Sequence, residues 1–194
     1  ALAGLGAATA IGNRLDQGPG LLVPTLLEFG SEEQKRRFIP PTLAGAMKWC
    51  QGYSEPGSGS DLASLQTTAR LDGDHWVING QKIWTSNARH ADYMFGLFRT
   101  DPESERHRGL SYLLVPLDTP GVTVREFGRL DGDEGFAEVF FDDAFLADDA
   151  VPGGVLLGDE GAGWKVAMAT TGSERGLTLR SPGRFLATAA RLID

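Results

Sequence analysis

The run CQGYSEPGSGSD, residues 50–61, decides how the rest of the chain is interpreted. It holds three glycines, one proline, three serines and two carboxylates. Because glycine is conformationally loose and proline lacks an N–H group, the run predicts a shaped loop and excludes a regular helix or a central strand. Successive N–H groups in such a loop form a concavity that suits an anion such as a phosphate. Glycine-rich loops are common, so the composition alone favours an ordinary polar turn over an anion site.

A second motif, VINGQKIWTSN at residues 77–87, follows the loop. Within it, Asn79-Gly80 predicts a hairpin turn between two apolar runs. Together the two motifs resemble the acyl-CoA dehydrogenases, whose middle β-domain binds FAD through an SEPGxGSD loop and a VINGQKxWTSN segment at this spacing. Two long motifs in register are far more specific than either one alone. The resemblance extends over residues 21–176, most of the chain.

The resemblance implies a flavin site. Such a site must bind the pyrophosphate, form hydrogen bonds to the flavin ring and pack side chains against the face of the ring. Tyr53 and Ser54 match positions that bond the pyrimidine end of the ring, and Gly59 and Ser60 match the pyrophosphate contact. Ser60 also matches a position beside the path of the acyl-CoA. The implied cofactor-binding residues are Gln51, Tyr53, Ser54, Gly59, Ser60, Trp84, Thr85 and Ser86.

Trp84 matches the tryptophan that packs on the isoalloxazine, with Thr85 and Ser86 beside it. The hydroxyl of Ser86 matches a donor near flavin N5, where it would stabilise the reduced ring. Without the flanking motif, a tryptophan here would be interpreted as a core aromatic at a strand end.

The implied reaction is α,β-dehydrogenation of an acyl-CoA to the 2-enoyl-CoA. A carboxylate removes the α-proton while the β-hydrogen leaves as hydride to flavin N5, and the base is a Glu in an apolar pocket that raises its pKa. In one branch of the family this Glu lies in a C-terminal helical bundle, beyond residue 194. In another it lies on the first helix after the β-domain, followed by Arg. Glu174 and Arg175 match that second arrangement, with Arg175 near the thioester; a charged pair on a helix surface is the alternative.

The resemblance further implies an electron-transfer flavoprotein as acceptor and a homo- or hetero-oligomer, dimer or tetramer, whose neighbouring subunit completes the flavin site. Two rival interpretations stay open. One is a flavin oxidase or monooxygenase on the same scaffold, and the other is a non-catalytic FAD-binding subunit of a hetero-oligomer. The identity of the acyl chain is set by helices outside the β-domain and cannot be predicted from this sequence.

The charge and composition narrow the class of protein. A formal net charge of −8 over 194 residues argues against a nucleic-acid partner, which would require clustered Lys and Arg. The single cysteine, Cys50, excludes an intrachain disulfide and fits a reducing compartment. No apolar run approaches membrane-spanning length and no signal peptide is visible, so a cytoplasmic protein is predicted.

The expected fold class is an α+β fragment, with an antiparallel β-barrel or sandwich flanked by α-helices. The chain begins at Ala1 and is expected to be an internal segment of a longer protein. The expected parts are the end of an N-terminal helical domain (1–46), a β-barrel that binds FAD and acyl-CoA (47–160) and the start of a C-terminal helical domain (161–194).

The local patterns predict the individual elements. Helices are expected at 1–12, at 21–29 with Pro24 in the first turn, and after a Ser31–Gln34 capping box, with Pro40-Pro41 ending that helix. A loop is expected at 13–20. Strands are expected at 47–53, 67–71, 75–79, 81–85, 93–99, 110–116, 122–126 and 137–141. A helix at 164–179 is expected to be interrupted at 181–183 and followed by another helical piece at 184–194.

The remaining titratable residues give no metal-binding pattern. His75, His90 and His107 lie near predicted turns without metal spacing and are expected at the surface. The pairs Asp142-Asp143 and Asp148-Asp149 are expected in a solvated loop. Cys50 has no catalytic His partner and is interpreted as a small buried residue.

Overall fold

The computed structural model describes residues 17–130, 132 and 135–177 of the chain, with side chains as far as residue 172. The helical elements are η1 (Gly18–Leu22), α2 (Val23–Phe29), α3 (Glu32–Leu43), η2 (Leu62–Ser64), η3 (Ala88–His90), η4 (Asp148–Ala150) and α4 (Gly163–Leu177). The strands are β1 (Trp49–Gly52), β2 (Thr68–Asp72), β3 (His75–Ser86), β4 (Tyr93–Arg99), β5 (Leu110–Pro116), β6 (Val122–Phe127) and β7 (Phe136–Ala147). The helices expected at 1–12 and 184–194, and the interruption at 181–183, lie outside the described residues.

The strands form one seven-stranded sheet in the order β1-β4-β2-β3-β7-β6, with β5 paired to β4. Most pairings are antiparallel, but β1 runs parallel to β4. Phe98 of β4 packs edge-on against Phe141 of β7, although β2 and β3 separate these strands in the sheet order. The sheet therefore curls so that its far strands face each other, which confirms the expected β-barrel-like middle part with flanking helices.

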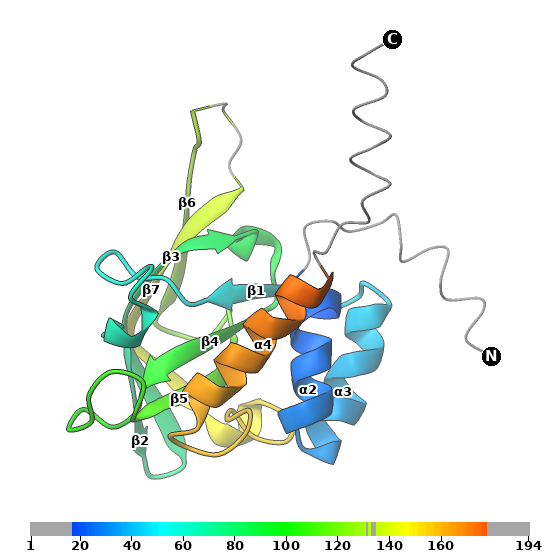
Figure 1. Cartoon of the computed structure of the whole chain (residues 1–194), viewed down its shortest axis with the longest axis horizontal. Coiled ribbons are helices and arrows are strands. Elements are labelled where there is room, and N and C mark those ends of the chain that lie inside the picture. The colour runs from blue at the N-terminus through cyan, green and yellow to red at the C-terminus, as the bar shows by residue number, and fades with distance from the viewer. Residues whose placement is uncertain (1–16, 131, 133–134, 178–194) are drawn as a thin grey trace.

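The helices cover one side of the curled sheet (Figure 1). There α2 and α3 lie side by side, and α4 crosses over β5 and β4. Nearly every residue of β4 and β5 is buried, because the helices cover one face and the curled sheet covers the other. Among the described residues, no helix combines the length and apolar character that crossing a membrane requires.

The first helices confirm one prediction and correct two others. The capping box is present, since the Ser31 hydroxyl accepts from Gln34 N at 3.1 Å and the Gln34 side chain accepts from Ser31 N at 3.0 Å. The loop expected at 13–20 is wrong from Gly18 onward, where η1 leads directly into α2.

The prediction that Pro40-Pro41 ends the helix is wrong, because α3 continues through both prolines to Leu43. The last turn gains a tertiary contact that local propensity does not reveal: Trp49 Nε1 donates to the buried Thr42 hydroxyl at 2.8 Å. This bond ties the end of α3 to the start of β1.

The hairpin predicted at residues 72–74 is confirmed between β2 and β3. The hairpin predicted at Asn79-Gly80 is wrong, because β3 runs without a turn from His75 to Ser86. Asn79 and Gly80 instead lie at a bulge, where the pairing of β3 with β7 shifts register. Across that bulge the Asn79 amide donates to the Asp143 carboxylate at 2.9 Å. Asp142 and Asp143, expected in a loop, therefore lie within β7.

Candidate functional site

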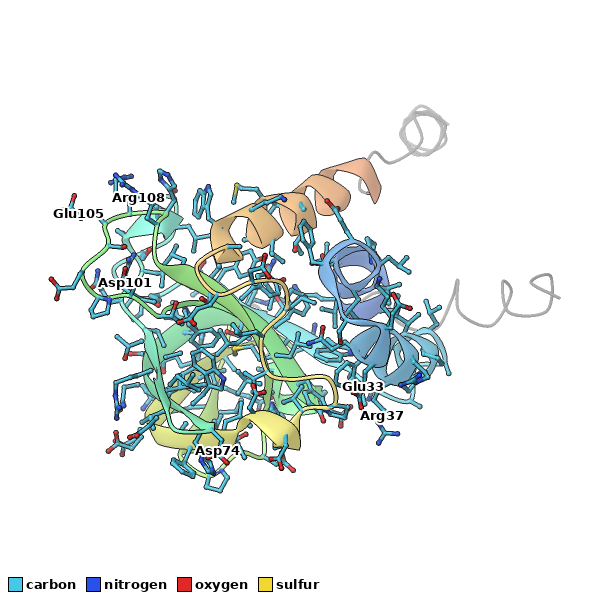
Figure 2. All side chains as sticks on the ribbon, turned by 90° about the horizontal axis from the view of Figure 1, so that it is seen from below. Glu33, Arg37, Asp74, Asp101, Glu105 and Arg108 are labelled. Atoms are coloured by element: carbon cyan, nitrogen blue, oxygen red, sulfur yellow. The ribbon has the colours of Figure 1, made fainter. Side chains whose placement is uncertain are left out.

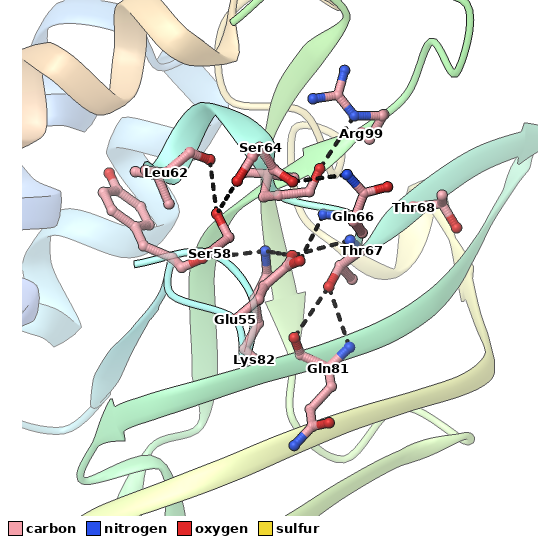
Figure 3. A network of polar contacts seen from close by, with 12 residues as sticks. Glu55, Ser58, Leu62, Ser64, Gln66, Thr67, Thr68, Gln81, Lys82 and Arg99 are labelled. Atoms are coloured by element: carbon pink, nitrogen blue, oxygen red, sulfur yellow. Dashed lines mark hydrogen bonds and ion pairs between the residues drawn. The ribbon is translucent and has the colours of Figure 1, made fainter. Parts of the chain in front are cut away.

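The two sequence motifs meet in space, although residues 62–76 separate them in the chain. Ile83 N donates to the carbonyl oxygen of Ser54 at 2.8 Å, which joins β3 to the glycine-rich loop. At the neighbouring position of each segment, Lys82 Nζ lies 2.7 Å from Glu55 Oε1 (Figure 3). Residues 50–61 and 77–87 therefore form a single site.

The glycine-rich loop is a tight turn with an open outer face. Glu55 and Ser58 exchange two backbone hydrogen bonds, of 2.8 and 3.0 Å, and so close the turn around Pro56 and Gly57. The Ser58 hydroxyl then donates to the carbonyl oxygen of Asp61 at 2.8 Å. A Cβ atom added at Gly57 or at Gly59 would meet no atom within 4 Å. The turn is therefore fixed at its base, while its outer rim is accessible to a ligand.

Trp84 is presented outward by a strained backbone. Its φ is +58°, a value that non-glycine residues adopt only rarely, and its side chain is 58% exposed. The pairing of β3 with β7 shifts between Lys82 and Thr85, and this second bulge turns Trp84 out and Thr85 in. The indole packs edge-on against Phe127 at 5.1 Å and Phe136 at 5.7 Å between ring centroids. A strained, exposed aromatic beside a shaped loop is typical of a ligand contact.

The other predicted contact residues lie around the same junction. Ser54 and Ser86 are half-buried and Ser60 is exposed. Thr85 Oγ1 and Gln51 Nε2 are buried atoms without a hydrogen-bond partner among the described residues. Buried polar groups are normally paired, so these two atoms fit a site that a polar ligand completes. FAD, with hydrogen-bonding groups along its ring and ribityl chain, fits this set of donors and acceptors.

The Tyr53 side chain points away from the loop rim and, through Tyr112, links the loop to α4. Its hydroxyl donates to the Tyr112 hydroxyl at 3.2 Å, and Tyr112 Oη lies 3.3 Å from Thr170 Oγ1 on α4. A flavin contact from residue 53 would therefore come from its main chain. Glu174 and Arg175 follow Thr170 by about one turn in α4, and their side chains lie outside the part that the structure describes.

The charged residues at the heart of the site, Glu55 and Lys82, are absent from the sequence-based prediction. Burial opposes ionisation of Glu55, but the Lys82 ammonium and the donating N–H of Gln66 outweigh it and hold the pKa of the carboxyl below its usual value. Burial, partly offset by Glu55, lowers the pKa of Lys82 to about 8. One signal was present in the sequence. Lys82 lies an even number of residues from the buried Trp76 and Ile78 of β3, so strand alternation predicts that its side chain is buried as well.

Cys50 is fully buried, which raises the pKa of its thiol and confirms its interpretation as a small core residue. Among the described residues, no group of three or more His, Cys, Asp or Glu side chains could hold a metal ion. Figure 2 shows charged side chains at the periphery, including Asp74 at the β2–β3 turn and Glu105 and Arg108 between β4 and β5.

Comparison with known proteins decides the family. Residues 50–144 match the family model described as acyl-CoA dehydrogenase, middle domain, and this range contains both motifs. The chain belongs to the acyl-CoA dehydrogenase family. The matched range lies within residues 21–176, over which the sequence resembles this family.

Three known proteins illustrate the similarity. The acyl-CoA dehydrogenase IpdE1 of Mycobacterium tuberculosis is 56% identical over 161 residues, which is 83% of this chain and 40% of that protein. The solved Tcur3481-Tcur3483 steroid ACAD is 37% identical, with a TM-score of 0.74 over 80% of this chain and 39% of its own. The ChsE4-ChsE5 complex from Mycobacterium tuberculosis is 38% identical, with a TM-score of 0.72 over 80% of this chain and 39% of its own. The chain thus spans about two fifths of the length of these proteins.

Proposed function

We propose that this chain is the flavin-binding part of an FAD-dependent acyl-CoA dehydrogenase that converts an acyl-CoA to the 2-enoyl-CoA. The observation that carries the proposal is the junction of the glycine-rich loop with the strained, exposed Trp84, joined by the hydrogen bond between Ile83 and Ser54. We propose the middle domain at 47–160, between helical parts at 1–46 and 161–194. The family membership and the open loop rim support this assignment.

The residues around the junction would each contact a different part of FAD. Gly59 and Ser60, on the open rim, would bind the pyrophosphate through N–H and hydroxyl groups. Ser54 and the main chain of Tyr53 would bond the pyrimidine end of the ring, and the Trp84 indole would pack on it. Gln51, Thr85 and Ser86 would supply further hydrogen bonds; the unpaired buried atoms of Gln51 and Thr85 support this role for the first two.

The chemistry needs a base for the α-proton and an acceptor for the β-hydrogen. FAD, when bound, would accept the β-hydrogen together with its electron pair. We assign the base to the Glu174 carboxylate, which would take the α-proton as the C–H bond electrons form the new double bond, with Arg175 near the thioester. The support is positional: α4 approaches the loop through Thr170 and Tyr112, and residue 174 follows one turn later.

The proposed partners follow from the same family. We propose an electron-transfer flavoprotein as the electron acceptor and an oligomer in which a neighbouring subunit completes the flavin site. The similarity to the ChsE4-ChsE5 complex favours a hetero-oligomer as one form of that assembly. The similarity to a steroid ACAD adds steroid thioesters to the substrate classes that deserve a test.

The test is an anaerobic titration of the full-length, FAD-loaded protein with straight-chain and steroid acyl-CoAs, in the wild type and in Glu174→Gln. We expect the flavin absorbance near 450 nm to bleach on the order of a thousandfold faster in the wild type than in the variant. Bleaching at equal rates in both would contradict the assignment of Glu174 and move the base beyond residue 194. Bound flavin that no acyl-CoA bleaches would contradict the dehydrogenase and favour a monooxygenase or a non-catalytic subunit.

A further inference from the structure

The ion pair between Lys82 and Glu55 differs from the other ion pairs in the described part of the chain. Its side chains are 0% and 6% exposed, whereas each of the other pairs has a member exposed by more than half. A buried pair gives up the hydration of both charges, and replacing it by apolar residues often leaves stability unchanged or raises it. Fold stability alone is therefore a weak explanation for this pair.

The Glu55 carboxylate accepts hydrogen bonds from three donors on two segments (Figure 3). Its Oε1 accepts from Lys82 Nζ at 2.7 Å and from Thr67 N at 3.0 Å, and its Oε2 accepts from Gln66 N at 2.6 Å. The main chain of the same residue closes the turn with Ser58. One side chain thus ties the base of the glycine-rich loop both to β3 and to the segment that enters β2.

Lys82 also holds the glycine-rich loop, from its position on β3. Its ammonium lies 3.5 Å from the carbonyl oxygen of Tyr53 and 5.1 Å from the centre of the Phe98 ring. The next residue of β3 makes the bond between Ile83 and Ser54, so the loop is attached to β3 at consecutive positions. At the rim no side chain packs on Gly57 or Gly59, so hydrogen bonds rather than packing fix the shape of the turn there.

We propose that Glu55 and Lys82 are positioning residues that hold the glycine-rich loop in its FAD-binding shape and thereby set the affinity for FAD. The inference rests on the proposed FAD-binding function. Neither side chain needs to touch the cofactor, because both are buried beneath the turn. A loop that is fixed before binding loses less conformational freedom when the ligand arrives, so its affinity is higher.

The charge chemistry of the pair gives a specific set of variants. Glu55→Gln replaces one acceptor oxygen by an NH₂ group, which would face an N–H or an ammonium donor. Lys82→Met has a similar shape but leaves the carboxylate buried without its cation. The double variant Glu55→Gln/Lys82→Met removes both charges, and Glu55→Asp keeps the charge while withdrawing the carboxylate by one methylene. Arg125→Gln is the matched control, because it breaks an exposed ion pair with Glu138 on the same sheet.

The measurement is the Kd for FAD of the full-length apoprotein, followed by flavin fluorescence and absorbance, together with the melting temperature of the same apoprotein. We expect each single variant to raise the Kd at least tenfold, the double variant to raise it less than the sum of the single effects, and Arg125→Gln to leave it unchanged. Glu55→Asp supplies the decisive value if Glu55→Gln or Lys82→Met fails to fold, and we expect it also to raise the Kd.

Two results separate the possible failures. If the wild type binds FAD and the folded variants bind it equally well while their apoproteins melt earlier, the pair only stabilises the fold and this inference is overturned. If the wild type takes up no FAD at all, the proposed function is contradicted and the inference falls with it.

Discussion

At the scale of single residues, the balance around Glu55 has a consequence for stability as a function of pH. The carboxylate is ionised in the folded protein because the Lys82 ammonium and the donating N–H groups of Gln66 and Thr67 outweigh the effect of burial. Its folded-state pKa therefore lies below the unfolded value of about 4.5. Between these two values the unfolded chain binds more protons, so the free energy of unfolding rises with pH.

We predict that the contribution of Glu55 is complete above about pH 4.5 and is lost as the pH falls through the lower folded-state pKa. Urea unfolding of the full-length protein between pH 6 and pH 3 measures this loss. Glu55→Gln should lower the free energy of unfolding at pH 7 by about 3–5 kcal/mol, because it leaves Lys82 buried without its anion. The variant should also show a weaker decline toward low pH, whereas the exposed Glu105→Gln should keep the wild-type slope. A parallel decline in all three proteins would contradict the prediction.

At the scale of elements, the bulge at Gly80 allows β3 to run on where a turn was expected. Gly80 has a φ of +136°, and a Cβ atom added there would lie 2.7 Å from Thr67 Oγ1 and 2.8 Å from its Cα. The Thr67 hydroxyl also accepts from Gln81 N and donates to Gln81 O, both at 3.2 Å. The absence of a side chain at residue 80 therefore permits the close approach of the segment that carries Thr67, one of the donors to Glu55.

We predict that Gly80→Ala lowers the free energy of unfolding by about 3 kcal/mol, since backbone strain and a steric clash with Thr67 act together. Gly73→Ala in the β2–β3 turn is the matched control, because it also has a positive φ, +66°, but its Cβ would meet no atom within 4 Å. Its expected cost is about 1 kcal/mol. Denaturant midpoints and slopes measure both effects. Equal losses in the two variants would show that the approach of Thr67 is unimportant.

The elements also show which parts of the fold and of the candidate site were predictable. Local signals with a clear mechanism, such as the capping box at Ser31 and the turn at residues 72–74, predicted their structures correctly. Asn79-Gly80 failed because pairing with the long β7 outweighed a local turn preference, and Pro40-Pro41 failed because Trp49 bonds the last turn of α3. The proximity of the two motifs was predictable only through the family resemblance. The buried ion pair depends on contacts between distant segments, which local patterns do not reveal. Strand alternation indicates only that Lys82 is buried, and nothing comparable indicates that Glu55 is its partner.

At the scale of the whole molecule, a chain of hydroxyl groups connects the layers. It runs from Tyr53 beside the glycine-rich loop to Tyr112 on β5, to Thr170 on α4 and to Thr25 on α2, with contacts of 3.2, 3.3 and 2.9 Å. The last three of these side chains are fully or almost fully buried. Buried hydroxyls that lose a partner destabilise the protein, so this chain fixes how α4 sits against the sheet and α2.

We predict that Thr170→Val lowers the free energy of unfolding by about 1–3 kcal/mol, because Tyr112 and Thr25 each lose a buried partner. Thr171→Val is the matched control, since the Thr171 hydroxyl bonds only to the backbone of its own helix, at Ala167 and Met168. Its expected effect is within about 0.5 kcal/mol. Denaturant unfolding of the full-length protein measures both values.

A double-mutant cycle then tests whether the hydroxyls act as one network. Tyr112→Phe and Thr170→Val should together cost less than the sum of their single effects, because each removes the same buried contact. Additive losses, or equal losses in Thr170→Val and Thr171→Val, would mean that the hydroxyl chain does not hold α4. Less-than-additive losses would identify this chain as the connection through which the helix that carries Glu174 is fixed relative to the glycine-rich loop.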